Sequence, residues 1–328
     1  MTNVLDRRQF LGAAAALAAG GLPAFAHADA LETARVLCGF PAGGTTDAVS
    51  RRIADKLRGG YAKTVLVENK PGAGGRLAVE ELKRSPPDGS SLLLTPAAMI
   101  TLYPHIFTKL GYGIDDVTPV SAACLISFAL GVGPAVPASV TNVKEYLAWA
   151  KANPAQASYA TPGAGSPPHF LGMLLAKESG VALNHVPYRG SAPGIQDLLG
   201  GQVPAMSSPI GDYLPYLKEG KLRVLATSGP KRSRFTPDTP TYTEQGFKAL
   251  EMQEWYGFFL PGKAAPETVN RAAAAIHAAV QMPDVAEAFT QLGFEPFANS
   301  PAEIAKAVKE ENAAWGPIVK RVGFTPEG

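Results

Sequence analysis

The sequence has 328 residues, of which 46% are hydrophobic and 18% are charged. This composition excludes a disordered chain or a coiled coil and supplies enough apolar residues for one large core or two modest ones. Thirty basic residues against 28 acidic ones give a net charge of +2, and no run of lysine and arginine exceeds two residues. A nucleic-acid partner is therefore not expected, and the length favours two globular domains.

The first 28 residues have the pattern of an export signal. Arg7 and Arg8 precede an alanine-rich apolar run, which ends in alternating alanines that suit a signal peptidase. The segment resembles a twin-arginine signal peptide, so we expect cleavage near His27 or Asp29 and a mature protein in the periplasm. The alternative is a buried N-terminal helix.

From residue 34 onward, short apolar runs alternate with glycine-, proline- or serine-rich turns and with segments of helical spacing. This alternation is typical of α/β proteins with parallel strands. Residues 120–132 form a long apolar segment between two such series, and 229–241 is expected to be an exposed connection. The expected strands are 35–40, 64–68, 91–95, 158–160, 183–188, 222–227 and 255–260. The expected helices are 47–57, 77–83, 143–152, 170–178, 195–199, 213–218, 266–282, 285–292 and 301–320.

Beyond the first 28 residues, the sequence shows neither a membrane span nor a clear cysteine framework. No later stretch approaches the roughly 20 uninterrupted apolar residues that a transmembrane helix needs. Cys38 and Cys124 fall in apolar, strand-like runs, where two buried thiols are expected. An oxidising compartment would also permit a disulfide, and the sequence leaves that pairing open.

Two glycine-rich segments open directly into predicted helices. The first runs from Phe40 to Asp47 and the second from Tyr159 to His169. Glycines let the backbone approach a ligand, and the N–H groups of a helix's first turn favour an anion such as a carboxylate. The alternative for the first segment is that Thr46 or Asp47 only caps the helix, and for the second that prolines merely stiffen a loop. Together, the two segments would place two helix N-termini around one cleft.

Motifs for catalysis are not found. The serine of Gly190–Gly194 stands one place early for a nucleophile elbow, and the five histidines are scattered without metal-ligand spacing. We therefore expect no catalytic residue, no metal site and no cofactor. Arg189, at a predicted strand end, could face a ligand or be a solvated surface charge. His169 is interpreted as a helix-start residue rather than a base.

Several ordered motifs carry a resemblance to a known family. They are Phe40–Asp47, Glu68–Gly75, Pro87–Gly89, Val186–Pro193, Gly201–Val203, Gly220–Arg223 and Trp255–Gly257. In this order they resemble the Bug-type extracytoplasmic solute receptors of tripartite tricarboxylate transporters, over essentially the whole mature chain. Two departures stand out: Gly39 replaces a proline that such receptors usually show before Phe40, and Ser207 and Ser208 stand where relatives often place an acid.

The resemblance implies a periplasmic binding protein of the type II-like α/β class, with two domains and a ligand cleft between them. Domain one would combine 29–130 with 252–328, and domain two would span 131–251. The implied partners are a small carboxylate ligand and the membrane components of a tripartite tricarboxylate-type transporter, with the protein acting as a monomer. An exported hydrolase or isomerase using the same cleft is the alternative, and a signalling receptor is the other role left open.

The expected ligand-binding residues come from both glycine-rich segments and from the walls between them. The argument from the missing acid favours a mono- or dicarboxylate without an amine, because a buried ammonium would lack a partner. Asp212 is expected to cap a helix that begins at Tyr213. The candidate ligand-binding residues are Phe40, Gly43, Gly44, Thr45, Thr46, Asp47, Ala97, Ala98, Thr161, Gly163, Gly165, Ser166, His169, Tyr188 and Ser208.

Overall fold

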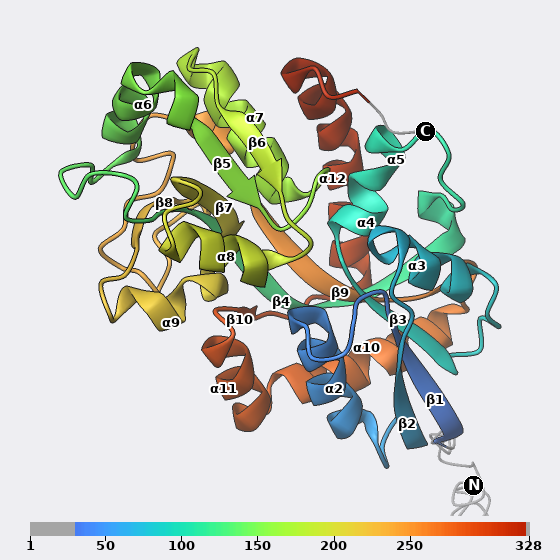
Figure 1. Cartoon of the computed structure of the whole chain (residues 1–328). Coiled ribbons are helices and arrows are strands. Elements are labelled where there is room, and N and C mark those ends of the chain that lie inside the picture. Colours follow the sequence, from blue (N-terminus) through green and yellow to red (C-terminus); the bar gives the residue numbers. More distant parts are fainter. Residues whose placement is uncertain (1–29, 326–328) are drawn as a thin grey trace, which may run out of the picture. The chain divides into compact units, whose positions relative to one another are not determined.

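The strands of the protein form one mixed sheet. The computed structural model describes residues 30–325, so the predicted export signal at 1–28 lies outside the described residues. The strands are β1 (Leu31–Cys38), β2 (Ala62–Asn69), β3 (Ser91–Pro96), β4 (Val117–Val132), β5 (Ser158–Thr161), β6 (Asn184–Pro187), β7 (Ala205–Pro209), β8 (Arg223–Thr227), β9 (Gln253–Pro261) and β10 (Glu295–Pro296). Their order is β2-β1-β3-β9-β4-β7-β5-β6, and β8 and β10 also pair with β4 (Figure 1).

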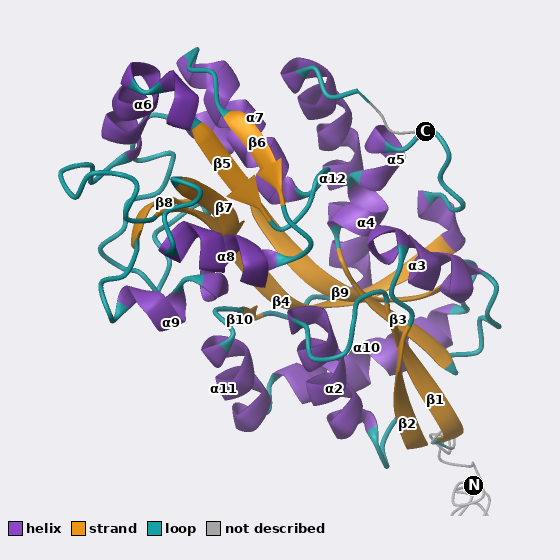
Figure 2. Ribbon diagram, in the orientation of Figure 1, coloured by secondary structure: helices purple, strands orange, loops and turns teal. Residues whose placement is uncertain are grey.

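Helices cover both faces of this sheet (Figure 2). For example, α2 and α10 pack against each other and share one hydrophobic cluster, whereas α3 and α12 contribute to the cluster on the other face. The alternation predicted from the sequence is confirmed. The helices are α2 (Thr45–Leu57), α3 (Arg76–Lys83), α4 (Ala98–Thr101), α5 (Tyr103–Ile106), α6 (Val143–Ala152), α7 (Pro167–Ser179), α8 (Ser191–Leu199), α9 (Leu214–Leu217), α10 (Pro266–Val280), α11 (Pro283–Gln291) and α12 (Pro301–Val322).

Strand β4 joins two halves of the sheet. Its residues Val117–Ser127 pair with β9, and Phe128–Val132 pair with β7. We call β1, β2, β3, β9 and the β9-paired part of β4 the first half, and β5, β6, β7, β8 and the rest of β4 the second half. The change of partner lies near the predicted domain boundary at residue 130, and the division into two domains stays a prediction.

Each half combines parallel and antiparallel pairs, of which the parallel ones were expected from the sequence. β1 is parallel to β2 and β3, and β5 is parallel to β6 and β7. In contrast, β9 is antiparallel to both β3 and β4. Segment 120–132 belongs to a strand buried on both faces, so it lacks the alternation of apolar and polar residues that marks a half-exposed strand.

Several element boundaries differ from the sequence prediction. Strand β7 and helices α4 and α5 were not predicted, because a strand of small polar residues and single helical turns carry little periodic signal. Helix α7 begins at Pro167 rather than residue 170, since proline is accommodated in the first turn of a helix. Helix α9 begins at Leu214 rather than Tyr213 and has no side-chain cap, so the prediction that Asp212 caps it is wrong.

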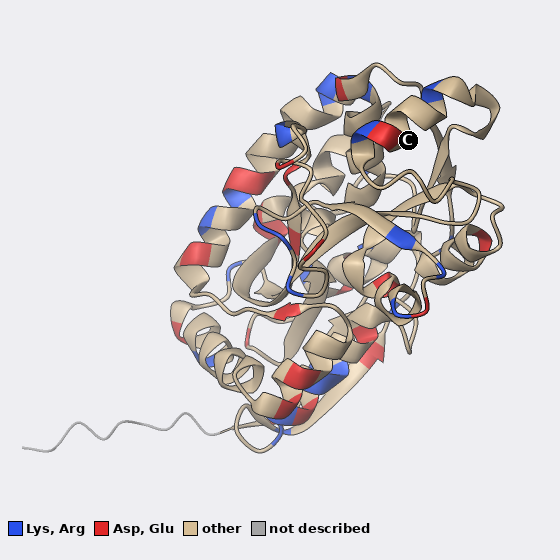
Figure 3. Cartoon of the chain, turned by 90° about the vertical axis from the view of Figure 1, so that its left-hand side faces the viewer, with Lys and Arg blue, Asp and Glu red and all other residues tan. Residues whose placement is uncertain are grey.

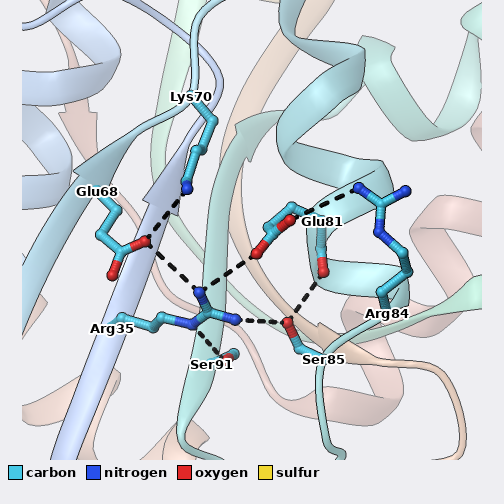
Figure 4. A network of polar contacts seen from close by, with 7 residues as sticks. All are labelled: Arg35, Glu68, Lys70, Glu81, Arg84, Ser85 and Ser91. Carbon is cyan, nitrogen blue, oxygen red and sulfur yellow. Dashed lines mark hydrogen bonds and ion pairs between the residues drawn. The ribbon is translucent and has the colours of Figure 1, made fainter.

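A network of polar contacts ties the strands of the first half to α3 (Figure 4). Arg35, on β1, donates to the hydroxyls of Ser91 at 2.9 Å and Ser85 at 3.0 Å. It also forms ion pairs with Glu68 at 3.5 Å and Glu81 at 3.4 Å. Because every donor meets an acceptor from a neighbouring element, this network has a structural role.

The charged residues are distributed as the small net charge of the chain suggests. In the cartoon of Figure 3, the positions of acidic and basic residues along the chain are interspersed rather than separated by sign. Cys38 and Cys124 are both buried and free, so the described structure contains two thiols and not a disulfide between them. Within residues 30–325, every helix is too short or too polar to cross a membrane.

Candidate functional site

The first glycine-rich loop, residues 39–44, connects β1 to α2 and begins with a close backbone contact. A Cβ atom on Gly39 would lie 2.7 Å from the carbonyl oxygen of Gly75, so only glycine fits there. This contact explains why the chain departs from the family's proline at this position. Residues Gly43, Gly44 and Thr45 are exposed, whereas Thr46 is buried.

Asp47 holds this loop from inside. Its carboxylate accepts hydrogen bonds from the Gly43 N–H at 2.8 Å, from Nε of Arg51 at 2.9 Å and from Nδ2 of Asn69 at 2.8 Å. Burial alone would raise the pKa of Asp47, but the hydrogen bonds from Arg51, Gly43 and Asn69 outweigh it and hold that pKa below its usual value. Because both oxygens are occupied, we leave Asp47 out of the proposed ligand contacts.

The N-terminus of α2 remains available to a ligand. Its N-cap, Gly44, has no side chain, and no side-chain hydrogen bond caps the helix. The first-turn N–H groups therefore point outward beside the exposed Thr45, and together with the helix dipole they favour an anion. Burial raises the pKa of Tyr256, and contacts with the hydroxyls of Thr45 and Thr46, which lower it, place this phenol directly beneath the helix start.

The second glycine-rich loop, residues 162–166, connects β5 to α7 and offers fewer donors than the sequence suggested. Pro167 and Pro168 have no N–H, and the N–H of His169 already donates to the carbonyl of Ser166 at 2.9 Å. The hydroxyl of Ser166 donates to Gly163 at 2.7 Å and does not cap the helix. The start of α7 therefore offers a ligand fewer N–H groups than the start of α2, and the placement of both helix starts around one cleft stays a prediction.

Helix α8 supplies the missing N-terminus in the second half. Its N-cap is Gly190, without a side-chain cap, and Ser191 and Ala192 follow. Gly190 donates to the carbonyl of Pro162 at 2.8 Å, so the start of α8 is fixed to the second glycine-rich loop. This helix start was not predicted from the sequence, where Tyr188 and Arg189 were the residues of interest in this stretch. A glycine followed by a serine, as at Gly190 and Ser191, is nevertheless typical of a helix N-terminus.

Tyr188 and Arg189 have different surroundings. The phenol of Tyr188 donates to Asp197 at 2.6 Å, and burial, with that hydrogen bond and the charge of Asp197, raises the pKa of Tyr188 to about 12. Its backbone N–H donates to Thr161 at 2.9 Å, which joins β6 to the second loop. Arg189 is an exposed residue.

An acid does lie beside Ser208. The hydroxyl of Ser208, at the end of β7, donates to the carboxylate of Asp212, and Ser191 lies in the same cluster. Burial raises the pKa of Asp212, while its hydrogen bonds with Ser191 and Ser208 lower it in part. The inference that the second half lacks an acid at this place is therefore wrong, because Asp212 reaches the position from the following turn.

Ala97 and Ala98 line a pocket of about 220 Å³ together with Pro167 at the start of α7. Three glutamates line this pocket, and two of them, Glu254 and Glu311, also accept hydrogen bonds from neighbouring residues. Glu254 accepts a hydrogen bond from the Ala98 N–H at 3.2 Å, and Glu311 accepts one from Nε1 of Trp255 at 2.6 Å. Burial, and for Glu254 also the charge of Glu311, raises the pKa of Glu254 to about 8 and that of Glu311 to about 7.

These two glutamates were missed by the sequence analysis. Glu311 does carry a signal, since it falls on the same helical face as Ile304, Val308 and Trp315, where a charge interrupts an apolar stripe. Glu254 directly precedes the predicted strand 255–260 and gave no such signal. Among residues 30–325, no group of three or more His, Cys, Asp or Glu side chains could hold a metal ion.

The structure thus assembles the predicted site residues into separate groups. Each group lies where a strand ends or a helix starts, as the sequence suggested. The groups are the first loop with α2 (Phe40, Gly43, Gly44, Thr45, Thr46 and Asp47), the pocket wall (Ala97 and Ala98), the second loop with β6 (Thr161, Gly163, Gly165, Ser166, His169 and Tyr188) and the end of β7 (Ser208).

Comparison with known proteins finds one matching family model and several relatives. The family model described as "Tripartite tricarboxylate transporter family receptor" matches residues 49–324. The chain is 33% identical over 329 residues to a protein of Cupriavidus necator encoded in the gbd 5′ region, covering 98% of this chain and 99% of that one. It is 31% identical over 289 residues to the protein BugT of Bordetella pertussis, covering 87% of each.

Solved structures show the same fold. The periplasmic binding protein BugD is 30% identical, with a TM-score of 0.78 over 90% of this chain and 99% of that one. MatC of Rhodopseudomonas palustris with bound malate is 28% identical, with a TM-score of 0.77 over 88% and 98% of the two chains. Rpa4515 of R. palustris with adipate is 27% identical, with a TM-score of 0.80 over 90% and 98%. The protein therefore has the α/β fold of the periplasmic binding proteins.

Proposed function

The chain belongs to the tripartite tricarboxylate transporter receptor family, and we propose that it is an extracytoplasmic solute-binding receptor that captures a small carboxylate. The observation that carries this proposal is the start of α2, where exposed Gly43 and Gly44 precede a helix without a side-chain cap. An N-terminus of this kind binds a carboxylate through its N–H groups and its dipole.

A second polar contact would come from the start of α8. Ser191 and Ala192 follow an N-cap glycine there, and the second glycine-rich loop fixes their position. A dicarboxylate could place one carboxylate on each helix start, with Thr45 supplying a hydroxyl donor and Ala97 and Ala98 an apolar wall. The relatives with malate and adipate both hold dicarboxylates, which supports this class.

We propose an acid without an amine, on a revised argument. An acid is present at Asp212, but the hydroxyl of Ser208 already donates to it, and Ser191 lies in the same cluster. The carboxylate of Asp47 is likewise occupied by three donors. A ligand ammonium would have to displace these partners, and a buried charge without a partner is costly.

The proposal extends to mechanism and partners. Ligand would favour a closed state of the two halves, which the membrane components of a tripartite tricarboxylate-type transporter would recognise. Delivery to the periplasm would use the segment 1–28 as a cleaved twin-arginine signal, and the receptor would act as a monomer. Ligand would be bound without chemical change.

A thermal-shift screen with malate, succinate, adipate, benzoate, aspartate and glutamate tests the ligand class. At about a hundred times the dissociation constant, a bound acid adds roughly 2.7 kcal/mol of stability. We expect the largest shift with an amine-free acid. A larger shift with aspartate or glutamate would contradict the amine-free class, and a product seen by mass spectrometry after incubation would favour the hydrolase or isomerase alternative.

Two matched variants test the site. Gly44→Asp and Gly44→Asn add side chains of nearly equal shape at the start of α2, and the backbone angle φ of −75° accepts both. Only aspartate adds a negative charge where the ligand's carboxylate should lie. We expect calorimetry to show at least a tenfold weaker affinity for Gly44→Asp, about 1.4 kcal/mol, than for Gly44→Asn. Equal affinities would move the site away from α2.

A further inference from the structure

Two imidazole rings stack behind the second glycine-rich loop. His169 lies in α7 and His185 in β6, and their ring centroids are 3.6 Å apart with an interplanar angle of 12°. The ring of Tyr159 packs on His185 at 5.2 Å, and that of Phe324 meets His169 edge-on at 5.8 Å. Only 8% of the surface of His169 is exposed. The packing on both sides therefore fixes the positions of the two rings in the second half of the sheet.

The loop's hydrogen bonds determine where His169 carries its proton. The N–H of Gly165 donates to Nδ1 of His169 at 3.1 Å. A ring nitrogen accepts a hydrogen bond only when it bears no proton. Neutral His169 must therefore carry its proton on Nε2.

The contact of His185 is with the hydroxyl of Thr161, whose oxygen lies 2.7 Å from Nε2 of the ring. The same hydroxyl lies 3.1 Å from the carbonyl of Gly163. A hydroxyl both donates and accepts, so this contact is compatible with either neutral tautomer of His185. In both tautomers the hydrogen bond ties β6 to the end of β5, where the second loop begins.

The surroundings disfavour a positive charge on either ring. A cavity of about 680 Å³ opens beside the stack, and Lys177 is the charged residue among the described residues that line it. Tyr159 is the other ionisable neighbour, and Val322 of α12 and Phe324 just beyond it are uncharged, while Arg321 of α12 pairs with Glu178 of α7. Burial, and for His169 also the charge of His185, lowers the pKa of both histidines to about 4.

Protonation would break the support of the loop. A second proton on His169 would occupy Nδ1 and face the N–H of Gly165, so two donors would oppose each other. We propose that His169 and His185 are positioning residues: as neutral imidazoles, with the proton of His169 on Nε2, they hold the second glycine-rich loop in its ligand-binding form, and acid releases the loop. The inference rests on the proposed function, because that function assigns the loop to the ligand site.

One experiment tests the positioning role without any ligand. In His169→Asn, the side-chain oxygen takes the place of Nδ1 as acceptor and cannot be protonated, whereas His169→Leu has no acceptor. We expect the Gly165 amide to be protected from hydrogen exchange in the wild-type protein and in His169→Asn at pH 7, and to lose at least about tenfold of its protection in His169→Leu, the equivalent of one hydrogen bond.

The pH dependence separates this role from simple packing. Between pH 7 and pH 4, the wild-type protein should lose protection at Gly165, and His169→Asn should keep it. Imidazole ¹⁵N spectra at pH 7 should show the ring of His169 protonated on Nε2. A proton on Nδ1 of His169, or unchanged protection in His169→Leu, would overturn the proposal.

A second arm measures ligand affinity by calorimetry with malate and adipate. We expect His169→Leu to bind about five- to tenfold more weakly than the wild-type protein at pH 7, in line with one lost hydrogen bond, and His169→Asn to bind within about twofold. His185→Gln, which keeps a hydrogen-bonding group for Thr161, is the matching control on β6. If neither acid binds, the proposed function fails, while the exchange experiment still decides the positioning role. Equal affinity in His169→Leu and the wild-type protein would overturn the inference.

Discussion

The two glycine-rich loops share one sequence pattern, yet they are stabilised in opposite ways. Under the first loop, the charged carboxylate of Asp47 accepts from three donors, and those bonds keep its pKa low. Behind the second loop, two neutral imidazoles and the hydroxyls of Thr161 and Ser166 make the contacts. A glycine-rich segment that opens into a helix therefore indicates a possible anion site without saying how the loop is held.

The loops also differ in what they can offer to a ligand. Helix α2 starts after Gly44 with free first-turn N–H groups, whereas α7 starts with Pro167 and Pro168, which have none. In the second half, α8 is the helix that begins after an N-cap glycine without a side-chain cap. A helix start next to a glycine-rich loop therefore does not by itself provide free N–H groups, because the residues of the first turn decide whether such groups are present.

A large loss of stability is expected from removing the charged anchor. Asp47→Ala would leave the N–H of Gly43 and the amide of Asn69 without their acceptor, so we expect a loss of about 2–3 kcal/mol in the free energy of unfolding, measured in urea. Asp55→Ala is the matched control, because its ion pair with Arg58 is exposed and should be worth less than about 1 kcal/mol. Equal losses in both variants would show that Asp47 does not anchor the loop.

A second prediction contrasts Asp47 with Glu254, whose pKa is raised from 4.5 to about 8. The folded protein then holds this proton more tightly than the unfolded chain, so stability falls as pH rises from about 4.5 towards 8. Glu254→Gln keeps an acceptor for Ala98 but does not titrate. We expect its melting temperature to fall less than that of the wild-type protein between pH 5 and pH 8.

The expected difference in this second test is on the order of ten degrees. Each pKa unit is worth about 1.4 kcal/mol, and about 1 kcal/mol moves the melting temperature of a protein of this size class by roughly 2–4 °C. Asp47 should not contribute in this window, since its lowered pKa places its loss of stability at acid pH. Parallel melting curves for the two proteins across the window would refute the assignment of a raised pKa to Glu254.

The smallest expected effect concerns Ser166. Its hydroxyl donates to Gly163 at 2.7 Å inside the second loop, so Ser166→Ala should cost about 1 kcal/mol in the free energy of unfolding. Ser166→Thr keeps the hydroxyl and should cost less. A loss in Ser166→Thr as large as that in Ser166→Ala would mean that packing, and not the hydrogen bond, sets the role of this residue.

Local patterns predicted much of the secondary structure. Helix α6 spans the predicted residues 143–152, and β3 begins at the predicted Ser91. These elements were predictable because a helix cap or an apolar run between turns marks their limits in the sequence itself. Strand β7 was missed since its buried serines break the apolar pattern on which strand prediction depends.

By itself, the sequence determined the alternation of strands and helices, the two glycine-rich loops and the resemblance to a receptor family, because these depend on neighbouring residues. The sequence also shows that the start of α7 lacks N–H groups, because Pro167 and Pro168 occupy its first two positions. The tertiary structure alone decided that Glu254 meets Glu311 in one pocket, that Asp212 reaches Ser208 and that His169 stacks on His185. Such contacts, and the pKa shifts that follow from them, depend on which elements pack together, and no local spacing encodes that.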